Sequence, residues 1–153
     1  MTRQASILLV EDNTMDLELA LDAFREVALA NDIHVCRTGE EALDHLFGPG
    51  NGEGRPAQPP PDLILLDLKL PGIDGFEVLR RVKGADGLRR IPVVILSSSK
   101  DEGDRIMGYD CGANSYLVKP IVFDDFIRVV RTIGDYWLTL NANAPIDEGP
   151  HGP

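Results

Sequence analysis

Short apolar runs alternate with longer amphipathic segments along this chain, and the alternation limits the folds that it can adopt. Near-continuous apolar runs are typical of strands that are buried on both faces, and the segments between them have helical spacing. Such βα units pack as a parallel sheet covered by helices on both faces, and right-handed crossovers leave few topologies. The predicted strands are residues 5–10, 32–38, 62–67, 91–99 and 115–120, and the predicted helices are 13–28, 38–48, 75–86, 100–113 and 123–141.

Two of the predicted helices carry start signals. Asn13 or Thr14 is placed to cap the first helix, because a short polar side chain can accept a hydrogen bond from the first turn. In the second helix, Thr38 is followed three residues later by Glu41, which is the spacing of a capping box. Apolar residues recur four apart in the first segment, which predicts a helix over residues 13–28; they are Met15, Leu19, Ala23 and Val27.

The length and the glycine-rich segments indicate how the chain is divided. A chain of 153 residues suits a single domain, which we place at residues 1–141. Glycine and proline dominate residues 48–61, so we expect a surface loop there. Its glycines precede a strand rather than a helix, which argues against a phosphate-binding loop. The polar residues 142–153 are expected to form a disordered tail.

Composition argues against several classes of function. The chain has 25 acidic and 15 basic residues and a net charge of −10, whereas sequence-independent nucleic-acid binding depends on Lys and Arg. No apolar run approaches the roughly 18 residues that span a membrane, and the first residues turn acidic too early for a signal peptide. Cys36 and Cys111 are interpreted as reduced thiols, and we expect a cytoplasmic protein.

Asp67 is the most informative residue, because it ends the apolar run of residues 63–66. A charge at the edge of a buried strand is unfavourable unless another group pairs with it. In open parallel sheets, ligands bind beyond the carboxyl ends of the strands. The second predicted strand ends in Arg37 and Thr38, to which we assign no role. The ends of the other strands carry Glu11, Asp12, Ser97 and Lys119.

These groups together predict a site for an aspartyl phosphate. Three acids at one edge repel one another, and a divalent cation among them relieves the repulsion. Oxygen-only ligands suit Mg²⁺, and Lys119 offsets the remaining charge. A carboxylate can act as a nucleophile toward a phosphoryl group. Mg²⁺ and Lys119 then neutralise charge on the transferring group, and Ser97 donates a hydrogen bond to it.

Four motifs follow one another along the chain: "LLVEDN" (8–13), "LLDLKLPGIDG" (65–75), "VVILSS" (93–98) and "YLVKP" (116–120). Together they resemble a response-regulator receiver domain of two-component signalling. The resemblance implies a flavodoxin-like (βα)5 fold, with a doubly wound parallel sheet of strand order 2-1-3-4-5. It covers about residues 6–140, and it is specific because of the order and spacing of the motifs together.

The resemblance also implies a role for each site residue. Asp67 is then the phosphoacceptor, and Asp12 and Asp67 ligate Mg²⁺ directly. Glu11 holds the ion largely through water, and the backbone carbonyl of Lys69 is a further ligand. The three remaining residues are the switch hydroxyl, the switch aromatic and the conserved-type lysine, which match Ser97, Tyr116 and Lys119 respectively.

The loop before the third strand and the extension "DYWLTLN" narrow the resemblance to stand-alone regulators that pair with bacterial phytochrome histidine kinases. The chain departs from the family at Glu11, where Asp is commoner, and at Ser97, where Thr is frequent. Lys69 places a cation two residues after Asp67, where it is positioned to hinder an incoming water. We expect a signalling switch rather than a general enzyme, with output through protein contacts and no attached output domain.

Two other functions are compatible with the fold class. An aspartyl-nucleophile phosphatase or mutase typically has a second acid two residues after the nucleophile, but this chain has Lys69 there. A flavin-binding module needs a hydroxyl- and glycine-rich phosphate loop after the first strand. This chain instead has "VEDN", whose acids repel a phosphate. His34 and His45 are interpreted as structural, because no metal-like partners accompany them.

The last predicted helix is more apolar than a helix with one buried face needs to be. We expect one stripe to pack on the sheet and the other to form an exposed patch that supports a homodimer, with Tyr136 and Leu140 near its centre. The first stripe consists of Phe123, Ile127, Val130 and Trp137. The second consists of Val122, Phe126, Val129, Ile133, Tyr136 and Leu140.

Overall fold

The computed structural model describes residues 5–25, 30–48 and 59–140. Its strands are β1 (Ala5–Val10), β2 (Ala30–Cys36), β3 (Leu63–Leu66), β4 (Val93–Ser97) and β5 (Ser115–Val118). Its helices are α1 (Thr14–Arg25), α2 (Gly39–Phe47), α3 (Gly75–Gly84), α4 (Glu102–Asp110) and α5 (Phe123–Asp135), and α5 continues into a π-helical turn, η1 (Tyr136–Leu140). Every predicted strand and helix is therefore present, and the predicted ends differ from the observed ones by a few residues.

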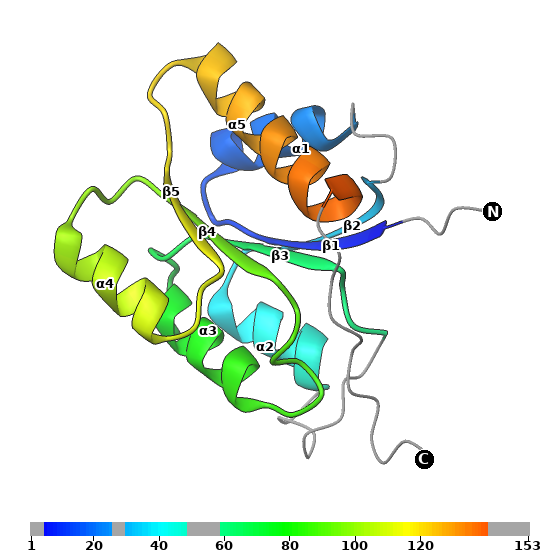
Figure 1. Cartoon of the computed structure of the whole chain (residues 1–153), viewed down its shortest axis with the longest axis vertical. Coiled ribbons are helices and arrows are strands. Elements are labelled where there is room, and N and C mark those ends of the chain that lie inside the picture. The colour runs from blue at the N-terminus through cyan, green and yellow to red at the C-terminus, as the bar shows by residue number, and fades with distance from the viewer. Residues whose placement is uncertain (1–4, 26–29, 49–58, 141–153) are drawn as a thin grey trace.

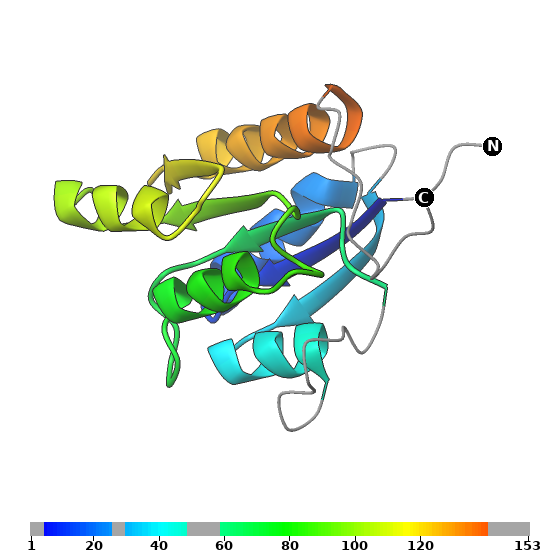
Figure 2. The same cartoon turned by 60° about the horizontal axis from the view of Figure 1, so that its bottom comes forward.

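The five strands form one parallel sheet in the order β2-β1-β3-β4-β5, which confirms the doubly wound topology. Figure 1 shows α1 and α5 together on one face of the sheet. The turned view in Figure 2 shows α2 and α3 on the opposite face, with α4 beside α3. The strand order reverses between β1 and β3, and the carboxyl ends of these two strands are where a fold of this kind binds its ligand.

The core lies in two layers, because successive side chains of a strand point to opposite faces of the sheet. On β1, Ile7 and Leu9 pack in the layer that contains Phe24 of α1. Leu8 and Val10 pack in the layer on the other face, with α2 and α3. Every residue of β3 and β4 is buried, which explains why these strands appear in the sequence as continuous apolar runs.

The predicted capping residues start their helices. Asn13, rather than Thr14, caps α1: its Oδ1 accepts a hydrogen bond from the backbone N–H of Asp16 at 2.9 Å. Thr38 caps α2, and its Oγ1 accepts from the backbone N–H of Glu41 at 3.0 Å. The Glu41 carboxylate reaches back to the backbone N–H of Arg37, one residue before the cap, at 3.0 Å.

The spacing that predicted the helix α1 does not mark its buried face. Met15 is 60% exposed and Leu19 is only partly buried, while Val27 lies outside the described residues. Each step of four residues advances about 40° beyond a full turn, so a strict four-residue stripe winds away from the face that packs on the sheet. The residues of α1 that are buried are Leu17, Ala20, Ala23 and Phe24.

The last helix is buried along a line that follows neither predicted stripe. Its buried apolar side chains are Phe126, Val130 and Ile133, which come from both stripes. Its exposed apolar side chains therefore also come from both, and they gather near its two ends. Val122, Phe123 and Tyr136 are exposed by 59%, 54% and 48%. The regular α-helix ends at Asp135 rather than at residue 141, and the side chain of Leu140 lies outside the described residues.

Two predictions about irregular segments fall largely on residues that the structure does not describe. These are the tail at 142–153 and most of the loop at 48–61. Within residues 5–25, 30–48 and 59–140, no helix is both long enough and apolar enough to cross a membrane.

Candidate functional site

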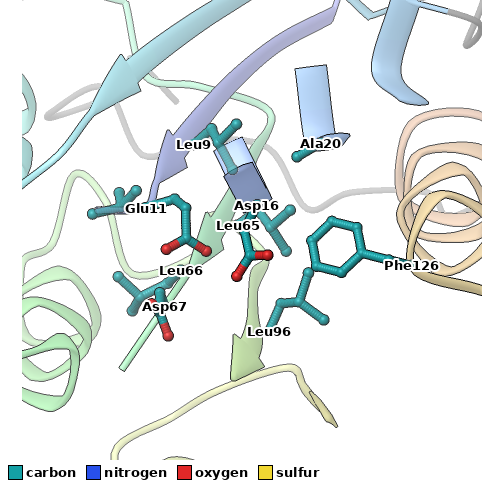
Figure 3. Close-up of a pocket in the computed structure, with 10 residues that line it drawn as sticks. Leu9, Glu11, Asp16, Ala20, Leu65, Leu66, Asp67, Leu96 and Phe126 are labelled. Carbon is teal, nitrogen blue, oxygen red and sulfur yellow. The ribbon is translucent and has the colours of Figure 1, made fainter. Parts of the chain in front are cut away.

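The register of the sheet places Glu11 and Asp67 next to each other. Val10 is paired with Leu66, so the residues that follow them leave the sheet together. The backbone N–H of Asp67 donates to the carbonyl of Val10 at 3.0 Å, and the backbone N–H of Glu11 donates to the carbonyl of Cys36 at 3.0 Å. Figure 3 shows both carboxylates pointing into one pocket beyond the strand ends.

Lys119 lies at the centre of this acidic group. Its backbone N–H donates to the carbonyl of Ser97 at 2.7 Å, which fixes the start of its side chain beside β4. The side chain is 9% exposed. Its Nζ lies near three carboxylate oxygens, at 2.7 Å from Glu11 Oε1, 2.9 Å from Asp16 Oδ2 and 3.4 Å from Asp67 Oδ2. The structure therefore brings Glu11, Asp67 and Lys119 together as predicted.

Burial and charge shift the pKa values of two of these groups in the same direction. Burial raises the pKa of Glu11 to about 7, the nearby Asp67 carboxylate adds to the increase, and Lys119 opposes it. For Lys119, burial lowers the pKa, but the ion pairs with Glu11, Asp16 and Asp67 outweigh burial and raise the pKa above its ordinary value. The Lys119 ammonium is therefore charged at neutral pH, whereas the Glu11 carboxyl titrates near neutral pH.

Asp12 lies beside this group, on the exposed loop between β1 and α1. Arg37 braces that loop from the end of β2. Its Nη2 donates to the backbone carbonyl of Asp12 at 2.9 Å and to Thr14 Oγ1 at 2.7 Å. From the other side, the backbone N–H of Asn13 donates to Glu11 Oε2 at 3.0 Å. The loop that carries Asp12 is thus held at both its ends.

Lys69 lies on the loop between β3 and α3, and its side chain is exposed between the buried Leu68 and Leu70. The loop is braced by α2, because Glu40 Oε1 accepts a hydrogen bond from the backbone N–H of Ile73 at 2.8 Å. This hydrogen bond fixes the backbone of the loop that follows Asp67 from outside the site.

Ser97 and Tyr116 are joined through Ser99. Ser97 is fully buried at the end of β4, and its Oγ accepts from the backbone N–H of Ser99 at 3.2 Å. The Tyr116 hydroxyl donates to the Ser99 carbonyl at 3.1 Å. Ser99 Oγ in turn donates to Asp104 Oδ2 of α4 at 2.6 Å. Tyr116 is also a core residue, packed with the α2 and α3 layer.

The donor chemistry fits a hard divalent cation. Glu11 and Asp67 are both under 9% exposed, and carboxylate oxygens are the ligands that a hard divalent cation prefers. The geometry is not that of a preformed metal centre: over the part of the chain that the structure describes, no three His, Cys, Asp or Glu side chains are arranged to hold a metal. Glu11 and Asp67 contact Lys119 instead.

Three residues of the site were not identified from the sequence. Asp16 is the third acid on Lys119, and the signal for it is its position in the first turn of the helix that follows Glu11 and Asp12. Arg37, to which no role was assigned, holds the loop that carries Asp12. Ser99 lies within the run "SSS", and only the contacts of its backbone carbonyl and its hydroxyl distinguish it from the neighbouring serines.

A family model for the response regulator receiver domain matches residues 7–131. The chain belongs to the response-regulator receiver family. The match begins within β1 and includes β2 to β5, so the motifs and the fold agree on the same family. The domain is a phosphorylation-dependent signalling switch of two-component systems, and neither the phosphatase nor the flavin-module alternative is favoured. Receiver domains are generally not enzymes in their own right.

Similar proteins include stand-alone regulators. Response regulator Rcp1 of Synechocystis sp. is 39% identical over 86% of this chain and 88% of its own. The probable methanogenesis regulatory protein FilR2 of Methanothrix harundinacea is 42% identical over 88% of this chain and 84% of its own. The phosphorylated cyanobacterial phytochrome response regulator RcpA has a TM-score of 0.83 at 35% identity, over 93% of this chain and 99% of its own.

The resemblance to phytochrome-associated regulators is confirmed by the similarity to the phytochrome response regulator RcpA. A structure of Rcp1 in its Mn²⁺-bound form has a TM-score of 0.83 to this chain at 36% identity, over 92% of this chain and 99% of its own. Receiver domains bind a divalent metal, in agreement with the oxygen donors found here.

Proposed function

We propose that Asp67 is the phosphoacceptor of this receiver domain and that a histidine kinase supplies the phosphoryl group. The observation that carries the proposal is the place of Asp67: a buried carboxylate at the end of β3, 3.4 Å from Lys119 Nζ. An Asp67 oxygen attacks the phosphorus of the kinase phosphohistidine. The phosphorus–nitrogen bond breaks, its electron pair stays on the imidazole, and an aspartyl phosphate forms.

Lys119 and Ser97 act on the transferred group. The ammonium of Lys119 neutralises charge on a phosphoryl oxygen, and the Ser97 hydroxyl donates a hydrogen bond to another. Glu11, Asp12, Asp67 and the backbone carbonyl of Lys69 are the groups that would hold Mg²⁺, and the ion, when bound, supplies positive charge to the phosphoryl oxygens. The catalytic contribution of the chain is limited to its own phosphotransfer and to loss of the phosphoryl group.

The Ser97–Ser99–Tyr116 connection carries the switch. A phosphoryl group on Asp67 draws the Ser97 hydroxyl toward itself, and Ser97 is hydrogen-bonded to Ser99. Ser99 holds both the Tyr116 hydroxyl and Asp104 of α4. A change at Ser97 therefore reaches β5 and α4 through Ser99, by two hydrogen bonds along each path.

The partner is a histidine kinase of the bacterial phytochrome class. This proposal is supported by the similarity to RcpA, which is described as a phytochrome response regulator, over nearly the full length of both chains. Phosphotransfer profiling against candidate kinases tests it. Preferential transfer from a phytochrome-type kinase is expected, and equal or better transfer from unrelated kinases would argue against this pairing.

The receiver domain forms a homodimer through α5, with Tyr136 near the contact. The support is the exposure of apolar side chains at both ends of α5, where Phe123 and Tyr136 are about half exposed. Sedimentation velocity with and without phosphorylation tests this. Tyr136→Glu is expected to give a monomer, whereas Thr132→Glu, which adds the same charge at an exposed polar position of α5, is expected to leave the dimer intact.

The phosphoacceptor is tested by incubating the chain with Mg²⁺ and acetyl phosphate and measuring its intact mass. The wild type is expected to gain the mass of one phosphoryl group, and Asp67→Asn none, because an amide is not a nucleophile of this kind. Equal phosphorylation of the two proteins would place the acceptor elsewhere. Circular dichroism of Asp67→Asn checks that the variant is folded.

A further inference from the structure

Asp16 is a third carboxylate in the site, and neither the motifs nor the family fold gives it a role. We propose that Asp16 is a positioning residue that holds the ammonium of Lys119 back from Asp67, and thereby slows phosphorylation and shortens the life of the aspartyl phosphate. The inference rests on the proposed function of Asp67, and it concerns how that function is tuned.

The distances around Lys119 show an uneven competition. An ammonium group has three N–H donors, and the three acceptors here are carboxylate oxygens. Glu11 and Asp16 are at hydrogen-bond distance, 2.7 and 2.9 Å, whereas Asp67 lies at 3.4 Å, the long limit of such a contact. The ammonium is therefore displaced from the phosphoacceptor and toward the other two acids.

Asp16 differs from Glu11 in how firmly it is held. The second oxygen of Glu11 accepts the backbone N–H of Asn13 at 3.0 Å, and the Glu11 side chain is 6% exposed. The Asp16 side chain is 25% exposed, on the first turn of α1. Figure 3 shows its carboxylate pointing into the same pocket as those of Glu11 and Asp67. Asp16 is thus the carboxylate that can break its contact with Lys119, turn toward solvent and form the contact again.

Phosphorylation changes what Lys119 must contact. An Asp67 oxygen attacks the phosphorus of acetyl phosphate, the phosphorus–oxygen bond to acetate breaks, and acetate leaves with the electron pair. The aspartyl phosphate carries more negative charge than the carboxylate it replaces, so the phosphoryl oxygens compete with Asp16 for Lys119. An Asp16 that keeps part of the ammonium leaves the phosphoryl group less neutralised, both while it forms and afterwards.

The test uses the full chain with Mg²⁺ and acetyl phosphate, and follows intact mass with time. Asp16→Asn removes the charge and keeps the shape. We expect its phosphorylation to be about two- to fivefold faster, as for loss of one partly exposed ion pair. After desalting removes the donor, we expect its phosphorylated form to last about two- to fivefold longer, by the same reasoning. Because acetyl phosphate has been removed, its charge does not affect this second measurement.

Three controls separate positioning from other effects. Asp16→Glu keeps the charge and is expected to stay close to the wild type. Asp22→Asn changes net charge equally on the same helix, but Asp22 is 61% exposed and pairs with Arg25, so no change is expected. In a Lys119→Met background, Asp16→Asn is expected to change neither rate nor lifetime, because Asp16 acts through Lys119. Asp16→Ser replaces Asp16→Asn if that variant does not fold.

The outcomes distinguish this inference from the proposed function. If the wild type is phosphorylated on Asp67 but Asp16→Asn has the wild-type rate and lifetime, the role of Asp16 is wrong and the function stands. An effect that persists without Lys119 also overturns the positioning role. If the wild type takes up no phosphoryl group on Asp67, the proposed function itself fails.

Discussion

Two partly buried lysines lie at opposite ends of the sheet. Each makes three polar contacts, but the pKa of one is raised and the pKa of the other is lowered. Lys119, after β5, meets three carboxylates, of Glu11, Asp16 and Asp67. Lys83, near the end of α3, meets three neutral oxygens before β4 and β5. These are the carbonyls of Arg89 and Ile91, at 3.1 and 2.7 Å, and Asn114 Oδ1 at 3.0 Å.

The two pKa values differ in direction for this reason. Burial lowers the pKa of Lys83 to about 8. The pKa of Lys119 is raised, because three carboxylates outweigh a similar burial. Neutral oxygens satisfy the hydrogen bonds of an ammonium without balancing its charge, whereas carboxylates do both. Lys83 is thus a structural tie between loops, and Lys119 is a retained charge at the end where chemistry takes place.

The largest expected effect comes from removing each lysine in turn. Lys119→Met is expected to slow phosphorylation of Asp67 by about 100-fold, because the charge that stabilises the transferring group is lost. Lys83→Met, its matched control, is expected to leave the rate unchanged. Intact-mass kinetics with acetyl phosphate measure both. Equal slowing in both variants would remove the distinction between a functional and a structural lysine.

Magnesium should act at only one of the two ends. Because Mg²⁺ binds the folded acids and not the unfolded chain, it is expected to stabilise the fold by about 2.7 kcal/mol at a hundred times its Kd. Asp12→Ala is expected to remove most of this gain, and Lys83→Met to keep it. Thermal melts with and without Mg²⁺ provide the measurement. A full Mg²⁺ shift in Asp12→Ala would show that the ion binds elsewhere.

The free energy of unfolding should depend chiefly on Lys83, which lies at the end of the sheet opposite to the site. Lys83→Met removes a donor from three oxygens, of which Asn114 Oδ1 keeps the backbone N–H of Val93 at 2.8 Å. The substitution is expected to lower the free energy of unfolding by about 1–3 kcal/mol. Urea denaturation at pH 7 measures the loss. Arg81→Met removes an exposed cation that lies two residues before Lys83 on α3 and pairs with Glu77. It serves as the control and is expected to change stability by less than about 0.5 kcal/mol. A Lys83 variant as stable as that control would contradict the structural role.

The smallest effect is the pH dependence of Lys83. Its folded pKa lies below the unfolded value of about 10.4, so its contribution to stability is fully present above that value and is lost as the pH falls through about 8. The wild type minus Lys83→Met stability difference should therefore grow from pH 8 to pH 10, by no more than about 1 kcal/mol because the group is partly solvated. Urea melts at the two pH values test this, and a difference that shrinks would reverse the sign.

The sheet and the principal acids could be predicted because their signals are local. Continuous apolar runs end in Glu11, Asp67, Ser97 and Lys119, and a parallel sheet brings strand ends together whatever the details of packing. The order of the motifs then supplied the strand order. Neither inference needs the direction of a helix side chain.

What could not be predicted depends on that direction. Asp16 reaches Lys119 only because α1 turns its first residues toward the strand ends. Arg37 becomes important only when its guanidinium is seen to cross to the loop that carries Asp12. The buried face of α5 was misassigned because residues four apart wind around a helix, and the packed face draws on more than one such row.

The central claim is that Asp67 receives the phosphoryl group, and mapping of the modified residue tests it most directly. Borohydride reduction of the phosphorylated chain converts an aspartyl phosphate into homoserine, which tandem mass spectrometry locates in the peptide sequence. The account predicts homoserine at Asp67, and none after reduction of chain that has not met a phosphodonor. Homoserine at Asp12 or Asp16, or no homoserine in a chain that gained one phosphoryl group, would contradict it.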